Sequence, residues 1–350
     1  MKQRIFNRIF LFLLFFLTWL DFTKFTSIPV SKIGEPIPIF PQIQINLLKS
    51  NNPRIIDDAI QETAKMLLKY FVPQLSEESW QSKFIFLDLI SDNEPELTLA
   101  LSLPPDKGIL ILLQKKDNHY FIASFQDHFS PITKLEELSL KNDLVFLVTI
   151  EDQQKQIGAL NKASILKLWK WQNNRLQETF SENIHWEINW QNNWENSTPA
   201  ETPKWYCLTQ KFKLTYRWEK EKLYLRTEGK QHFSAAPVNN TAFPAPYDFP
   251  SPFRVLKTRE ISQDYYWDNN WQKFILQTCH YLPPGKITPE EVAVLKDLDK
   301  HLESLAFEEP QQYLVINKKG DVFPLNKNDL LINEHSPKAL RPHFLQPNSR

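Results

Sequence analysis

The residues with the clearest chemical potential are tryptophans spaced four apart. Trp186, Trp190 and Trp194 share one short segment, and its WQNNW motif at 190–194 is echoed by WDNNW at 267–271, between Trp267 and Trp271. Residues four apart lie on one face of either a helix or a strand. Aromatic faces stack on sugar CH groups, while neighbouring amides bond hydroxyls. The pattern predicts a glycan-binding surface, although core packing of the same indoles is the simpler interpretation.

The two cysteines, Cys207 and Cys279, form the second pair with chemical potential. If oxidised, they would close a loop of about 70 residues, which contributes on the order of 4 kcal/mol in the chain-entropy model. The alternative is two buried free thiols. Neither cysteine has a neighbour at metal-ligand spacing, so the sequence predicts no metal site.

Recognisable catalytic motifs are missing from the chain. None of the eight histidines forms an i, i+4 pair, and no serine lies between glycines as in a nucleophile elbow. Asp57 and Asp58 are better explained as acids in the first turn of a helix, where the helix dipole favours them. A glycosidase would need two carboxylates about 5 to 9 Å apart, which any two strands could supply. We therefore assign no catalytic residue and keep a carbohydrate-active hydrolase as an alternative.

Composition argues against nucleotides, cofactors and nucleic acids. The six glycines are too dispersed to form a phosphate-binding loop, which needs glycine for close approach of backbone amides to the anion. Forty-one basic residues balance forty-one acidic residues, so no net field attracts a nucleic acid. We expect no cofactor, no nucleotide and no nucleic-acid partner.

The N-terminus is typical of an export signal. Lys2, Arg4 and Arg8 precede an apolar run at 9–20, which is shorter than the ~20 residues that span a bilayer comfortably. The following residues lack a small-x-small cleavage site, so residues 1–27 are either a signal peptide or an uncleaved membrane anchor. We expect an extracytoplasmic protein, secreted or anchored.

The elements that would position these residues are mostly strands. A helix should begin at Asn52 and end before Pro73, and a second helix should begin at the capping box of Thr288, with Leu295, Leu298, Leu302 and Leu305 as its apolar stripe. Between the helices, apolar runs alternate with turn-forming clusters. Strands are expected at 84–90, 97–103, 109–113, 120–125, 144–150, 165–171, 205–218, 222–233, 254–262, 264–267 and 274–281, with a last hairpin at 313–316 and 322–325.

Three hairpins recur around Trp171, Trp218 and Trp267, which lie 47 and 49 residues apart. Each has an aromatic strand, a polar turn and a second apolar strand. The first of them, at 165–176, resembles the hairpin of FG-GAP or VCBS-type repeats; the resemblance covers about 84–180 and would imply propeller blades. The Asp-x-Asp-x-Asp-Gly calcium run of that family is absent from this chain.

The sequence therefore predicts a mainly β (α+β) protein. An antiparallel hairpin meander would form a sandwich, an open barrel or a small propeller-like body, flanked by an N-terminal and a C-terminal helix. The expected divisions are a signal at 1–27, a proline-rich spacer at 28–51, the body at 52–282, a helix and hairpin at 283–333 and a disordered tail at 334–350.

The expected function is non-catalytic binding in the cell envelope. The expected partner is another envelope protein or, if the tryptophans form a sugar-binding surface, a cell-wall polysaccharide. An uncleaved signal would add contact with the membrane through residues 9–20. A glycan-binding module requires exposed tryptophans, whereas a protein-binding or structural role allows them to be buried.

Overall fold

The computed structural model describes residues 42–71, 80–116, 119–140, 144–157, 159–191, 204–219, 221–237, 253–307 and 311–331. The residues expected to form an export signal, those of the expected spacer up to residue 41, and the expected C-terminal tail lie outside these ranges, as does Trp194. Among the residues that the structure describes, no helix combines the length and the apolar character needed to cross a membrane. The chain divides into two compact units, 1–77 with 113–123, and 78–112 with 124–350.

The first unit contains two helices, α2 (Gln42–Leu48) and α3 (Pro53–Phe71). The predicted helix start is confirmed, because Asn52 Oδ1 accepts a hydrogen bond from the Arg54 amide at 3.1 Å, as an N-cap does. Helix α3 buries Ala59, Ala64 and Leu67 on one side. Gln44 Nε2 of α2 donates to the Ala59 carbonyl at 2.8 Å, which ties the two helices together.

Four strands near the start of the β region form a sheet in sequential order, β1-β2-β3-β4. They are β1 (Gln81–Leu87), β2 (Glu96–Leu103), β3 (Lys107–Lys116) and β4 (His119–Phe129). The apolar runs predicted at 84–90, 97–103, 109–113 and 120–125 fall on these strands. Strand β2 is buried along almost its whole length, as expected for a run without strict alternation.

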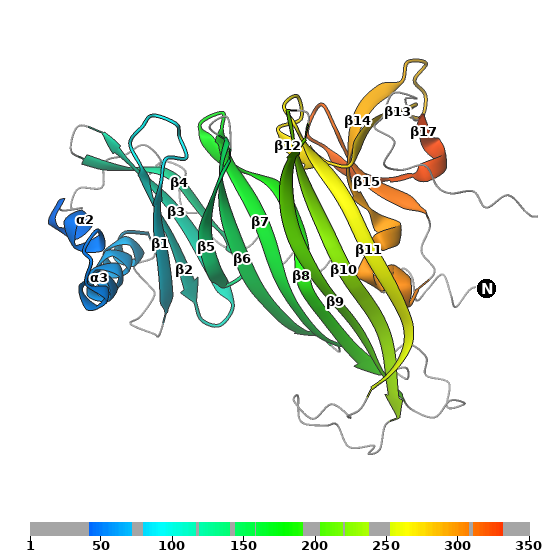
Figure 1. The fold of residues 1–350 in the computed structure, drawn as a ribbon, viewed down its shortest axis with the longest axis horizontal. Coiled ribbons are helices and arrows are strands. Elements are labelled where there is room, and N and C mark those ends of the chain that lie inside the picture. The colour runs from blue at the N-terminus through cyan, green and yellow to red at the C-terminus, as the bar shows by residue number, and fades with distance from the viewer. Residues whose placement is uncertain are drawn as a thin grey trace, which may run out of the picture. The chain divides into compact units, whose positions relative to one another are not determined.

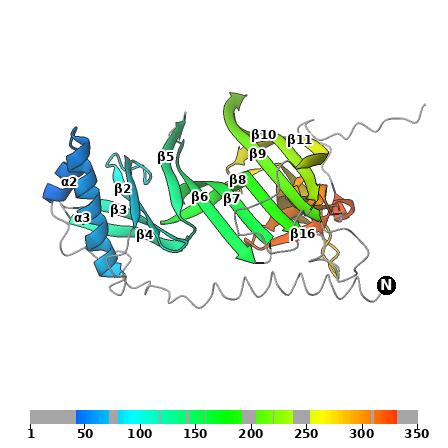
Figure 2. The same cartoon turned by 90° about the horizontal axis from the view of Figure 1, so that it is seen from below.

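The largest element is an eight-stranded antiparallel sheet that curls into a half-barrel (Figure 1). Its order is sequential, from β5 at one edge to β12 at the other, so every neighbour in the sheet is a neighbour in the chain. The strands are β5 (Ile132–Leu140), β6 (Leu144–Ile157), β7 (Ala159–Gln172), β8 (Arg175–Gln191), β9 (Lys204–Glu219), β10 (Lys222–Pro237), β11 (Arg254–Asp268) and β12 (Lys273–Ile275). Figure 2 shows the curvature from a second direction.

The three tryptophan hairpins are confirmed as the β7–β8, β9–β10 and β11–β12 connections. Residues with positive φ close all three: Asn173 and Asn174 in the first turn, Glu221 in the second and Gln272 in the third. Asparagine tolerates this conformation better than most residues, which explains why a glycine-poor chain can still make tight turns.

The C-terminal region forms a five-stranded sheet in the order β16-β15-β14-β13-β17. Its strands are β13 (Gln277–Tyr281), β14 (Glu290–Asp297), β15 (Gln312–Asn317), β16 (Val322–Asn326) and β17 (Leu330–Leu331). Three short 3-10 helices, η4 (Leu298–Lys300), η5 (Leu302–Leu305) and η6 (Lys327–Asp329), interrupt them.

The prediction of a C-terminal helix that begins at Thr288 is wrong. Residues 290–297 are strand β14, which lies between β13 and β15. Val292, Ala293 and Val294 are all fully buried, so both faces of this strand are covered. A continuous apolar run of this kind suits a central strand, and pairing with two neighbours overrides the local capping signal.

One core joins the half-barrel to the C-terminal sheet. It combines residues of the eight-stranded sheet, such as Phe146, Phe180 and Tyr265, with residues of the five-stranded sheet, such as Val292 and Val315. Phe180 and Tyr265 meet edge to face, with ring centroids 5.0 Å apart. Aromatic residues thus contribute to the packing of this shared core.

Candidate functional site

The inner face of the half-barrel is covered by the chain itself. We call residues 298–305, which comprise η4 and η5, the plug; η5 packs on strands β9 and β10, and η4 packs on β15. Leu302 and Leu305 of the plug share a cluster with Trp186, Trp190 and Leu208 of the sheet. The leucines that looked like a helical stripe therefore fill the inner face of the sheet from a pair of 3-10 turns.

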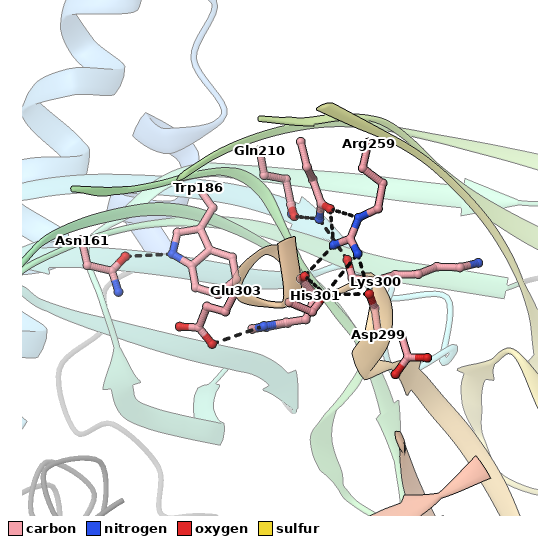
Figure 3. Close-up of polar contacts among 10 residues, drawn as sticks. Asn161, Trp186, Gln210, Arg259, Asp299, Lys300, His301 and Glu303 are labelled. Carbon is pink, nitrogen blue, oxygen red and sulfur yellow. Dashed lines mark hydrogen bonds and ion pairs between the residues drawn. The ribbon is translucent and has the colours of Figure 1, made fainter. Parts of the chain in front are cut away.

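Arg259 of β11 attaches the plug to the sheet (Figure 3). Its guanidinium donates to the carbonyl oxygens of Asp299 at 2.6 Å and His301 at 2.7 Å, and to Ser304 Oγ at 3.1 Å. It also donates twice to Gln231 Oε1, at 2.8 and 2.6 Å. Charge-assisted bonds of this kind are stronger than neutral ones, so Arg259 is the main polar anchor of the plug.

Gln231 completes the polar network beneath the plug. Its Nε2 donates to the carbonyl of Lys300 at 2.9 Å and to Gln210 Oε1 at 2.7 Å. Gln231 is fully buried and Gln210 is 3% exposed. Because both amides are bonded, the buried polar layer specifies the position of the plug.

Trp186 lies beneath the plug and is 7% exposed. Its Nε1 donates to Asn161 Oδ1 at 2.8 Å, and its ring meets His301 edge to face at 4.8 Å (Figure 3). His301 Nδ1 in turn lies 3.5 Å from the Glu303 carboxylate. The indole is thus occupied by contacts within the protein.

Trp190 lies in an aromatic cluster with Tyr206, Phe233 and Phe307. Its ring is nearly parallel to that of Phe233, with centroids 6.1 Å apart, and lies 5.7 Å from Phe307. Trp190 is 7% exposed, and its Nε1 has no hydrogen-bond partner among the described residues. Phe307, at 43% exposure, is the member of the cluster that reaches the surface.

The second tryptophan pair is also partly enclosed. Trp267 is 7% exposed and packs in the main core, with Nε1 donating to Asn269 Oδ1 at 2.8 Å, and Trp271 is half-buried. In this conformation Trp186, Trp190 and Trp267 cannot stack on a sugar, because protein atoms cover their faces. The structure does not place the five tryptophans on one exposed surface; Trp194 lies outside the described residues.

The alternative of a disulfide between Cys207 and Cys279 is corrected by the structure, where both residues are buried free thiols. Cys207 lies on β9 of the half-barrel, while Cys279 lies on β13 of the C-terminal sheet. Burial raises the pKa of Cys207 to about 12 and that of Cys279 to about 11. Both thiols therefore stay protonated and act as small core side chains.

An open groove of about 450 Å³ lies beside the plug. It is lined by Lys257, Asp299, Ser304, Leu305, Ala306, Phe307 and Gln311. Lys257 Nζ donates to the Leu305 carbonyl at 3.3 Å. Two further exposed apolar residues, Val255 and Leu256, precede Lys257 on β11. The groove thus joins an apolar surface to a lysine ammonium.

The acid in the groove already has partners. Asp299 Oδ2 lies 2.8 Å from Lys327 Nζ, and Oδ1 accepts a hydrogen bond from the Gln312 amide at 3.2 Å. No other described residue that lines the groove carries a carboxylate. Among the described residues, the groove therefore offers a single carboxylate, one fewer than glycoside hydrolysis needs.

A second polar site, which the sequence analysis missed, lies in the loop between β1 and β2. Asp88, Asp92 and Glu96 each have a carboxylate oxygen within 4.8 Å of the others. Glu96 is 1% exposed, and burial raises its pKa to about 7, with smaller contributions from the charges of Asp92 and Asp88. The spacing of four between successive acids was the available signal.

A third site is a buried ion pair on the opposite face of the half-barrel's first strands. Lys167 Nζ lies 2.8 Å from Glu151 Oε1, and also lies over the rings of Phe129 and Trp169. Trp169 Nε1 donates to Thr149 Oγ1 at 2.9 Å. These side chains satisfy one another, which is typical of a structural cluster.

No family model, no curated protein and no solved structure matches this chain. The resemblance to FG-GAP or VCBS-type repeats stays a prediction. We therefore classify the protein by its fold. It is a curled antiparallel half-barrel, and the plug packs on the inner face of this half-barrel.

Proposed function

We propose that this chain is a non-catalytic binding protein of the cell envelope, which docks another envelope protein at the groove beside the plug. The observation that carries the proposal is the open groove itself, which Phe307, 43% exposed, and Ala306 line together with Lys257. Aromatic residues at the centre of a surface with a polar rim are typical of protein interfaces. The extracytoplasmic location rests on the basic, then apolar, N-terminal residues.

A segment of another protein suits this groove better than a sugar does. Trp186, Trp190 and Trp267 are buried, whereas the groove is lined by Leu305, Ala306 and Phe307 together with polar side chains. Lys257 offers a cation to a carboxylate or a backbone carbonyl of the partner. The groove is open, which favours a chain lying across it over a small molecule enclosed by it.

Site-specific photo-crosslinking in the producing cells tests this proposal. A photoreactive residue at Phe307 in the full chain should give one discrete adduct with a second protein. The same residue at Ile287, which is 95% exposed on a different loop, is the matched control and should give no such adduct. Equal labelling from both positions, or none from Phe307, would contradict docking at the groove.

A fluorescence titration distinguishes the glycan-binding alternative from the docking of a protein at the groove. With the tryptophans packed as described, iodide should quench the emission only weakly, and soluble cell-wall polysaccharides should leave it unchanged. Strong quenching that one polysaccharide relieves would favour the sugar-binding alternative instead.

A further inference from the structure

The loop between β1 and β2 brings three carboxylates together around one point. Asp88 directly follows β1, and Glu96 opens β2, where it pairs with Leu87 across the hairpin. Asp92 lies midway between them in the sequence. One carboxylate oxygen of each residue lies within 4.8 Å of the other two. Two oxygens bound to one ion at a typical Ca–O distance of about 2.4 Å are at most about 4.8 Å apart, so each pair of these carboxylates is close enough to bind the same Ca²⁺.

Glu96 supplies an independent sign that a ligand is needed. Its Oε2 accepts hydrogen bonds from the amides of Leu89 at 2.8 Å and Ile90 at 3.0 Å. Its Oε1 is fully buried and has no hydrogen-bond partner among the described residues. A buried carboxylate oxygen without a partner is costly unless a cation or a donor reaches it.

The backbone keeps the three acids in place. Asp88 accepts hydrogen bonds from the amides of Asp92 at 3.1 Å and Asn93 at 3.0 Å, while Asp92 accepts one from Glu94 at 3.0 Å. These bonds hold the acidic loop in a turn that keeps Asp92 near Glu96. Without a cation, three neighbouring negative charges would repel one another.

The ligand atoms select the kind of cation. All three are carboxylate oxygens, which suit hard cations; zinc and copper prefer nitrogen or sulfur ligands. Mg²⁺ demands octahedral geometry at 2.0–2.1 Å, whereas Ca²⁺ accepts longer and less regular coordination. Three side chains of one loop supply an irregular set of ligands, which favours Ca²⁺.

We propose that Asp88, Asp92 and Glu96 form a Ca²⁺ site that closes the β1–β2 loop. This inference is independent of the groove and of the proposed partner. It adds a structural cation to a chain in which the sequence predicted none.

Calorimetric titration of the chelator-treated full chain with CaCl₂ tests the site. The wild type should bind one Ca²⁺, and its melting temperature should rise by a few degrees at saturation, because an ion that binds the folded state stabilises it. MgCl₂ at the same concentration should produce a smaller shift.

Variants within the loop make the test specific. Asp92→Asn, at an exposed position, should weaken Ca²⁺ binding at least tenfold without unfolding the protein, and Glu96→Gln should abolish it. Glu94→Gln is the matched control, since this acid is exposed in the same loop and outside the cluster. The proposal is overturned if the wild type binds no Ca²⁺ at millimolar concentration, if Mg²⁺ binds equally well, or if Asp92→Asn binds as tightly as Glu94→Gln.

Discussion

Single residues show that burial can outweigh charge pairing in this fold. Glu151 is 2% exposed and paired with Lys167, yet its pKa is raised above the usual 4.5. The larger cause is burial, which disfavours the carboxylate more than the nearby ammonium favours it. A buried ion pair of this kind is weak evidence for stability.

We predict that Glu151→Gln reduces the pH dependence of unfolding. Above pH 4.5 the folded protein holds the Glu151 proton after the unfolded chain has lost it, so the free energy of unfolding falls as the pH rises through this range. Urea unfolding from pH 4 to 8 would show a flatter profile for Glu151→Gln. Glu137→Gln, at an exposed position of β5, should keep the slope of the wild type.

At position 229, the close approach of the neighbouring strand requires glycine. It lies mid-strand in β10, opposite Phe212 of β9. A Cβ at this position would overlap the carbonyl oxygen of Lys211 and lie 2.8 Å from Cδ1 of Phe212. Glycine in a strand often marks such a close approach.

Gly229→Ala should therefore lower the free energy of unfolding by about 2 kcal/mol, the typical effect of forcing atoms into a packed site. Lys230→Ala, at the next residue, removes an exposed ion pair with Glu260. This substitution should change the free energy of unfolding by less than about 0.5 kcal/mol. Urea denaturation measures both. Equal stabilities of the two variants would show that the strands separate readily at this point.

Among the elements, the β7–β8 hairpin depends on two consecutive residues with positive φ. Asn173 has φ of 53° and Asn174 has φ of 56°, the arrangement of a type I′ turn. Glycine adopts this region at little cost, whereas alanine does not. The turn therefore sets the register of the β7–β8 hairpin.

We expect Asn174→Gly to leave stability unchanged or to raise it by about 0.5 kcal/mol, and Asn174→Ala to lower it by about 1 kcal/mol. Thermal unfolding of both variants provides the measurement. If alanine were tolerated as well as glycine, the turn would have to adopt another conformation in solution.

The half-barrel and the C-terminal sheet should unfold as one body, because these two sheets share a core. Cys207 lies in one sheet and Cys279 in the other, and both thiols are buried. We predict that a thiol reagent labels neither cysteine in the native protein. With increasing urea, both should become reactive over the same concentration range. Labelling of one thiol well before the other would show that the two sheets unfold separately.

The sequence alone determined the class of fold and the places where the chain turns. Period-two and continuous apolar runs predicted the antiparallel strands, and Asn52 with Pro53 predicted the start of α3, because these signals act between residues close in the chain. The polar turns after Trp171, Trp218 and Trp267 were predicted for the same reason. Strand β5 was missed, since its residues alternate poorly between apolar and polar.

Tertiary structure decided what local signals could not. Residues 290–297 carry helix-start signals, yet pairing on both sides makes them strand β14. The spacing of Trp186 and Trp190 suits an exposed surface as well as a core; the plug, more than a hundred residues later, decides that they are buried. In the same way, Arg259 finds its carbonyl partners forty residues away. Burial depends on contacts between distant segments, and spacing within one segment carries no information about them.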